Sequence, residues 1–135
     1  MKKYNLFLDD FRHPYDALQY TMDPVFSKLK WEIVRSHDQF VKFITKKFKA
    51  GEFPEIIAFD HDLDDAHYDH TAGDFPYEEM KEKTGFHSAK WLVDFCIDNN
   101  LKLPDYRVHS MNPCGRENIK GLLENFKKFQ ENESV

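Results

Sequence analysis

Four short apolar runs recur along the chain, each about as long as a β-strand. Their apolar character is nearly continuous, as expected of strands that are buried on both faces. The predicted strands are 4–8, 31–35, 55–59 and 106–108. Because parallel sheets are usually covered on both faces, these runs favour a parallel sheet.

Amphipathic segments separate the strands and carry helix-start signals. Ser36 and Gln39 have the spacing of a capping box, Thr84 can cap a helix, and Asn112 before Pro113 is typical of a helix start. The predicted helices are 14–20, 37–49, 85–100 and 113–129, with Ile97 and Phe129 on buried stripes, Gly51 as a helix stop and fraying over 130–135. Strands that alternate with helices predict one α/β domain over residues 1–135, with helices on both faces of the sheet.

The segment 64–83 fits neither pattern. It contains seven carboxylates and two histidines, and its apolar residues follow no helical or strand period. Loops of this length in a compact domain are usually lids, binding loops or inserts. We therefore expect an acidic insert or lid loop here.

Composition narrows the function. The chain has 135 residues, 24 of them acidic and 19 basic, for a net charge of −5, which argues against binding to duplex nucleic acid. We find no apolar run long enough to span a membrane and no signal-peptide pattern at the start. Cys96 and Cys114 are too few for a disulfide framework. These features predict a cytoplasmic protein.

Reactive side chains follow three of the four predicted strands. Asp9 and Asp10 follow the first strand, residues 60–62 (Asp-His-Asp) the third, and His109 and Ser110 the fourth. The carboxyl ends of parallel strands meet at one edge of the sheet, so these groups should share a small volume. Extended geometry would place Asp60 and Asp62 on the same side, with His61 on the other.

Carboxylates gathered in this way repel one another unless a cation binds or their pKa values rise. Asp9, Asp10, Asp60 and Asp62 are therefore candidate ligands of a divalent metal ion. Oxygen ligands suit Mg²⁺ or Mn²⁺, whereas a histidine ligand would shift the preference toward Mn²⁺, Fe²⁺ or Zn²⁺. Each Asp pair alone would equally fit turn or cap chemistry, so the prediction depends on their joint placement.

Other residues at the same edge suit phosphate chemistry. Arg12 follows the Asp pair, and Arg116 lies in the first turn of the last predicted helix, where free N–H groups favour anions. Arg116 could equally be a solvated surface residue. Ser110 and Asn112 are further candidate phosphate-binding residues. His61 and His109 could transfer a proton near neutral pH.

These residues resemble the acidic pocket of response-regulator receiver domains, with Asp9, Asp10, Asp60 and Ser110 on the matching positions. The strings at 8–14, 59–63, 84–85 and 109–113 are closer still to cyclic-phosphate processing receiver-like domains, over most of the chain. The resemblance implies a flavodoxin-like three-layer sandwich with strand order 2-1-3-4, and a nucleotide or cyclic-phosphate ligand. We find no fifth strand with the usual receiver lysine, which argues against a phosphorelay.

The expected function is metal-assisted phosphoester processing, such as hydrolysis of a cyclic nucleotide. Asp9, Asp10 and Asp60 would hold the ion, and His61 or His109 would transfer the proton. In a metal-free variant, His61 and His109 would act as an acid and base pair on opposite sides of a cyclic phosphate. One alternative is a non-catalytic sensor that binds a phosphorylated ligand or accepts phosphate on Asp60. Another is an interaction protein whose acidic strand ends hold only a structural cation.

Overall fold

A parallel sheet forms the centre of the computed structural model, which describes residues 1–64, 76–78 and 83–133. The strands lie in the order β2-β1-β3-β4. They are β1 (Lys2–Leu8), β2 (Glu32–Val34), β3 (Glu52–Phe59) and β4 (Asp105–Val108). The helices are α1 (Pro14–Thr21), α2 (Val25–Lys28), α3 (His37–Lys49), α4 (Gly85–Asp98) and α5 (Pro113–Glu133). The predicted α/β fold and strand order are confirmed.

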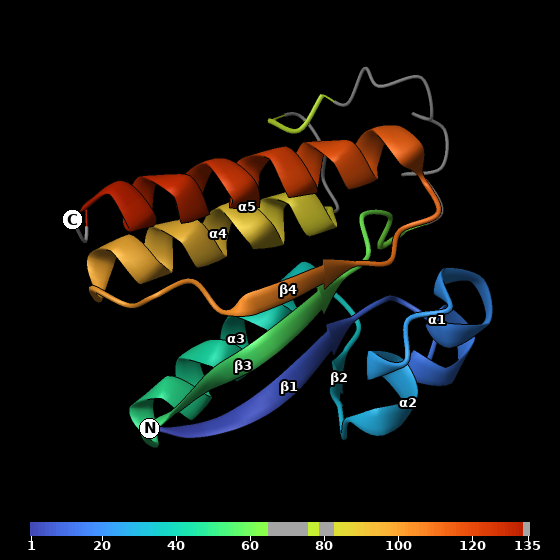
Figure 1. Ribbon diagram of the computed structural model, residues 1–135, viewed down its shortest axis with the longest axis horizontal. Helices are drawn as coiled ribbons and strands as arrows, with labels where there is room; N and C mark the ends of the chain where they lie inside the picture. The colour runs from blue at the N-terminus through green and yellow to red at the C-terminus, as the bar shows by residue number, and fades with distance from the viewer. Residues whose placement is uncertain (65–75, 79–82, 134–135) are drawn as a thin grey trace.

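Alternate residues of the central strands enter two separate cores. Leu8 of β1 and Phe59 of β3 belong to the larger core, together with residues of α3, α4 and α5. Phe7 and Ala58 face the opposite way and pack with Ala17 of α1 and with α2. Figure 1 shows α4 and α5 lying together, away from α1 and α2. The sheet is thus the middle of three layers, as predicted.

Local signals explain where α3 and α4 begin. Ser36 Oγ accepts the Gln39 N–H at 3.1 Å, and Thr84 Oγ1 accepts the Phe86 N–H at 3.2 Å. The Gln39 side chain accepts the N–H of Arg35 at 2.8 Å instead of that of Ser36, so the expected capping box is only half formed. Gly51, with φ of 83°, follows the end of α3 as predicted.

Several expectations at helix ends are wrong. Ile97 and Phe129 are 57% and 56% exposed, because the buried stripes run through their neighbours Cys96 and Phe126 instead. Helix α5 continues to Glu133, past the predicted start of fraying. Gln130 helps to hold this end, since its side chain bonds the backbone at Leu101 and Leu103, each at 2.9 Å. The structure also contains a short helix, α2, that the sequence pattern did not predict.

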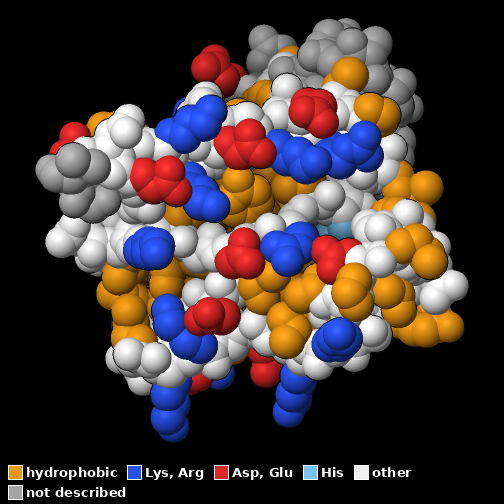
Figure 2. Space-filling view, viewed as in Figure 1, with side chains coloured by type: hydrophobic (Ala, Val, Ile, Leu, Met, Phe, Trp, Pro, Cys, Tyr) orange, Lys and Arg blue, Asp and Glu red, His pale blue; other side chains and the backbone are white. Residues whose placement is uncertain are grey.

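The sequence shows an excess of acidic residues and no apolar run long enough to span a membrane, and both features concern the surface of the molecule. Among the described residues, no helix combines the length and apolar character that crossing a membrane requires. On the face that Figure 2 shows, basic and acidic side chains are interspersed. Of the predicted acidic insert at 64–83, only residues 64, 76–78 and 83 are described, so the predicted lid or insert falls mostly outside the described residues. The single-domain assignment stays a prediction.

Helix α4 starts directly against the chain that leaves β3. The Gly85 N–H donates to the His61 carbonyl at 2.8 Å. A Cβ atom on Gly85 would overlap the carbonyl oxygen of Asp60. Since backbone atoms cannot move aside like the end of a side chain, this close approach requires glycine.

Gly85→Ala should therefore destabilise the fold by about 1–3 kcal/mol, the usual cost of overpacking. Urea unfolding measures the change. The control is Gly121→Ala, at an exposed position in α5 where a Cβ meets no atom within 4 Å. Alanine there should stabilise the helix by about 0.5–1 kcal/mol. Equal effects of the two substitutions would refute the close contact.

Candidate functional site

The register of the sheet brings the predicted site residues to one edge. Leu8 of β1 lies opposite Phe59 of β3. The Asp60 N–H donates to the Leu8 carbonyl at 2.9 Å, and the His109 N–H donates to the Phe59 carbonyl at 3.0 Å. Asp9, Asp60 and His109 therefore leave adjacent strands at the same level.

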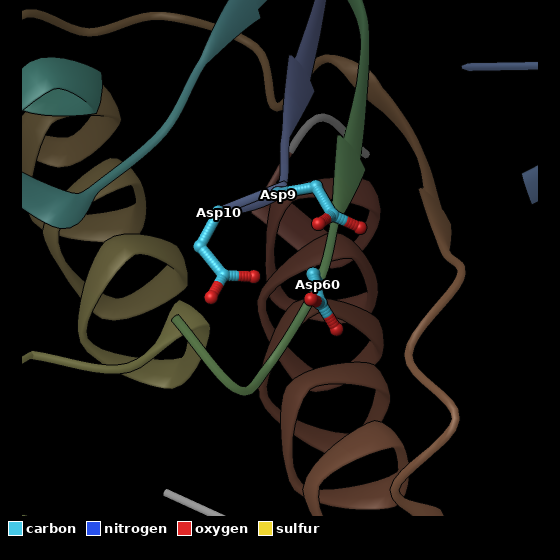
Figure 3. A group of neighbouring side chains, drawn as sticks. All are labelled: Asp9, Asp10 and Asp60. Atoms are coloured by element: carbon cyan, nitrogen blue, oxygen red, sulfur yellow. The ribbon is translucent and has the colours of Figure 1, made fainter. Parts of the chain in front are cut away.

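Three carboxylates converge at this edge. One oxygen from each of Asp9, Asp10 and Asp60 lies within 4.8 Å of the other two, and we call these residues the acidic cluster. Figure 3 shows the side chains at the ends of β1 and β3. Asp9 and Asp60 are buried, whereas Asp10 is half-buried. Of the four predicted metal ligands, the structure thus gathers these three.

Two members of the acidic cluster have oxygens without hydrogen bonds. Asp10 Oδ1 and Asp60 Oδ2 are buried, and no described residue donates a hydrogen bond to either. Burial, followed by the charge of Asp9, raises the pKa of Asp60 well above its usual value. The same two causes raise the pKa of Asp10 to about 6. A divalent cation would relieve this repulsion, so the acidic cluster fits Mg²⁺ or Mn²⁺.

Asp9 is the carboxylate of the cluster with the most hydrogen bonds. Its Oδ1 accepts the N–H groups of Phe11 and Arg12 at 3.1 and 2.9 Å, and its Oδ2 lies 3.1 Å from His109 Nε2. Burial raises its pKa, but the hydrogen bonds from His109 and the two backbone groups outweigh burial and leave the pKa lowered. Asp9 therefore stays ionised.

His109 is held between the acidic cluster and the smaller core. Its ring stacks on Phe7, with centroids 4.5 Å apart and planes 10° from parallel. Burial lowers its pKa, although Asp9 favours the charged form. The Tyr20 hydroxyl donates to the His109 backbone carbonyl at 2.6 Å. A neutral ring donating from Nε2 to Asp9 satisfies both the burial and the ionised carboxylate.

Arg12 supplies positive charge beside the acidic cluster. Its Nη1 lies 3.6 Å from Asp9 Oδ2 and 3.7 Å from Asp60 Oδ2, and its side chain is only 16% exposed. Arg35 donates to the backbone carbonyls of Asp9 and Arg12 and so holds the turn that positions this guanidinium. Sequence reasoning missed Arg35, since nothing at the end of the second strand indicated such a contact.

His61 and Asp62 form a different network. His61 Nδ1 lies 2.7 Å from Asp62 Oδ1, and His61 Nε2 lies 2.9 Å from the Tyr77 hydroxyl. Both Asp62 oxygens lie 3.3 Å from Asn112 Nδ2. The expected alternation fails because β3 ends at Phe59 and the chain bends at His61. This arrangement does not support the predicted metal role of Asp62.

The other predicted phosphate-binding residues hold the loop before α5. Ser110 Oγ accepts the Asn112 N–H at 3.1 Å, and Arg116 Nη1 donates to the Ser110 carbonyl at 3.1 Å. Asn112 Oδ1 caps α5 by accepting the Gly115 N–H at 3.1 Å. Their phosphate-binding role stays a prediction, whereas Arg12 does contact the acidic cluster.

Comparison with known families agrees with this geometry. A family model described as the cyclic-phosphate processing receiver domain matches residues 4–125. No curated protein and no solved structure matches the chain. The matched range includes the acidic cluster, Arg12 and both candidate histidines.

Asp10→Asn should stabilise the metal-free protein at alkaline pH. Because the pKa of Asp10 rises from 3.8 to about 6 on folding, the folded state binds this proton more tightly. The resulting stability is complete below pH 3.8 and is lost as the pH rises through about 6. Urea unfolding in EDTA should show the variant more stable than wild type above that window, with the difference vanishing in acid.

The matched control for this pH series is Asp94→Asn, at an exposed position on α4. The stability of this variant should match that of wild type at every pH. A stability difference for Asp10→Asn that does not change with pH would contradict the electrostatic explanation.

Arg12→Met should tighten the binding of Mn²⁺. The guanidinium lies beside the oxygens that would hold the ion, so removing its charge removes a competitor. Calorimetric titration should show a dissociation constant about fivefold lower, equivalent to roughly 1 kcal/mol. Arg116→Met is the control and should leave it unchanged. Weaker binding to Arg12→Met would contradict competition.

Proposed function

The chain belongs to the family of cyclic-phosphate processing receiver domains, and from this premise we propose that it opens a cyclic phosphate ester with the help of a divalent metal ion. One observation carries the proposal. The buried oxygens Asp10 Oδ1 and Asp60 Oδ2 lie in one cluster with no hydrogen bond from the described residues, and Arg12 lies beside them. Such a site can bind a cation and a phosphate together.

The three carboxylates of the acidic cluster would hold the ion. A bound Mg²⁺ or Mn²⁺ polarises a phosphoryl oxygen or lowers the pKa of a water molecule. Asp9 is already ionised and oriented by the N–H groups of Phe11 and Arg12, so it needs no rearrangement. The bound ion would favour the ionised forms of Asp10 and Asp60 and would therefore lower their raised pKa values.

Arg12 would bind the phosphate. Its guanidinium can donate to phosphoryl oxygens, and it would stabilise the charge that develops as the ring opens. In the reaction, a water oxygen attacks phosphorus, the ester P–O bond breaks, and the proton of the water ends on the leaving oxygen. The positive charge of Arg12 would offset the negative charge of the phosphoryl oxygens before, during and after ring opening.

The two histidines divide into different roles. His109 Nε2 contacts the acidic cluster through Asp9, whereas Asp62 and Tyr77 engage the two ring nitrogens of His61. We therefore prefer His109 to His61 as the histidine that supports the acidic cluster. Because its Nε2–H is directed at Asp9, we assign it to positioning that carboxylate.

A second candidate function is a sensor without turnover. The buried Oδ2 of Asp60, which accepts no hydrogen bond from the described residues, favours it, because this carboxylate could accept a phosphoryl group or bind a phosphorylated ligand through a cation. Treatment with acetyl phosphate followed by mass spectrometry tests this directly. A stable adduct at Asp60 without ring opening would support the sensor.

The enzyme proposal predicts ring opening by the purified chain. With Mn²⁺, ³¹P NMR should show 2′,3′-cyclic or 3′,5′-cyclic nucleotides converted to monoesters, and EDTA should stop the reaction. Asp60→Asn should lower the rate by about 100-fold or more, as loss of a group that stabilises transition-state charge does. Asp94→Asn should keep the wild-type rate.

His109→Gln separates positioning from folding. If His109 orients Asp9, the variant should weaken Mn²⁺ binding as well as turnover while keeping a cooperative unfolding transition. Absence of ring opening with every nucleotide and metal, in a folded wild-type protein, would refute the enzyme proposal.

A further inference from the structure

Apolar side chains surround the charged group beside the acidic cluster. The Arg12 guanidinium carbon lies 4.5 Å from the Phe11 ring centroid and 5.7 Å from that of Tyr20. Arg12 Nη2 also donates to Met111 Sδ at 3.4 Å. We call Phe11, Tyr20 and Met111 the apolar rim. They come from α1 and from two loops that are far apart in the sequence.

Two residues of the apolar rim are strongly exposed. Phe11 and Met111 expose 58% and 59% of their surface, although each contacts the largely buried Arg12 side chain. Figure 2 shows apolar side chains gathered at the end of the molecule where α1 lies. Neither side chain belongs to a core cluster. Adjacent exposed apolar residues around a polar site are typical of a ligand-binding surface.

Arg12 connects this surface to the phosphate chemistry. Its Nη1 lies beside Asp9 and Asp60, while its guanidinium plane and Nη2 contact Phe11 and Met111. If the phosphate of a ligand binds at the acidic cluster, only the Arg12 side chain therefore separates that phosphate from the apolar rim. An aromatic ring suits this surface, because aromatic rings stack on Phe and contact Met sulfur favourably.

We propose that Phe11 and Met111 bind the ring of a base-bearing ligand, so that the site selects cyclic phosphates that carry a nucleobase over those that carry a sugar alone. This inference rests on the proposed function and decides between the two ligand classes that it leaves open. Phe11 provides the stacking face, and Met111 contacts the ring from the other loop. Both are specificity-determining residues outside the metal site.

The test compares two ligands that differ only in the base. Adenosine 2′,3′-cyclic phosphate and the methyl riboside 2′,3′-cyclic phosphate are titrated into the full chain by NMR, with ³¹P spectra confirming that each ligand stays intact. Wild type should bind the adenosine compound about tenfold more tightly, a typical stacking contribution. Phe11→Ala and Met111→Ala should each reduce this preference without changing affinity for the riboside.

Two further variants control the experiment. Phe11→Tyr keeps the ring and should keep the preference, which separates loss of stacking from local misfolding. Phe129→Ala removes a similarly exposed phenylalanine from the end of α5 and should change neither affinity. Unchanged affinity for the riboside also shows that Arg12 and the acidic cluster remain in place.

The outcomes separate this inference from the proposed function. Equal wild-type affinities for the two ligands, or equal losses for both ligands in Phe11→Ala, would overturn the ring-binding surface and leave ring opening standing. Failure of wild type to bind either ligand would overturn both proposals. A base preference that Phe11→Ala abolishes and Phe11→Tyr keeps supports the inference.

Discussion

Repulsion among three carboxylates at one edge of the sheet is the constraint on which the rest of the site depends. The pairing of β1 with β3 imposes it, because the bond from the Asp60 N–H to the Leu8 carbonyl makes Asp9 and Asp60 neighbours. Hydrogen bonds outweigh burial only at Asp9, whereas the other two carboxylates keep raised pKa values. Binding of a cation at the acidic cluster therefore stabilises the folded chain.

The surrounding residues divide into those that serve the acidic cluster and those that hold its frame. Arg12 and His109 contact the carboxylates directly. The network of His61, Asp62 and Tyr77 instead ties the end of β3 to the start of α5 through Asn112. This division explains why two histidines that follow neighbouring strands have different surroundings.

The strands and the acidic cluster could be predicted because they depend on local patterns and on the shared edge of parallel strands, whereas the strand order was implied by the family resemblance. The pairing of Asp62 with His61 could not, since it depends on where β3 stops and how the chain then bends. The contacts of Arg35 and Tyr77 join segments far apart in the sequence, and no local pattern encodes them. Ile97 and Phe129 fit helical stripes, but those stripes extend beyond the core.

The most direct test of the shared cation site is anomalous diffraction from crystals of the chain grown with Mn²⁺. The account predicts one strong Mn²⁺ peak within bonding distance of Asp9, Asp10 and Asp60, with the Arg12 guanidinium moved from its position between Asp9 and Asp60. A well-ordered acidic cluster with no Mn²⁺ peak, or a peak bound only by carboxylates elsewhere, would contradict the central claim.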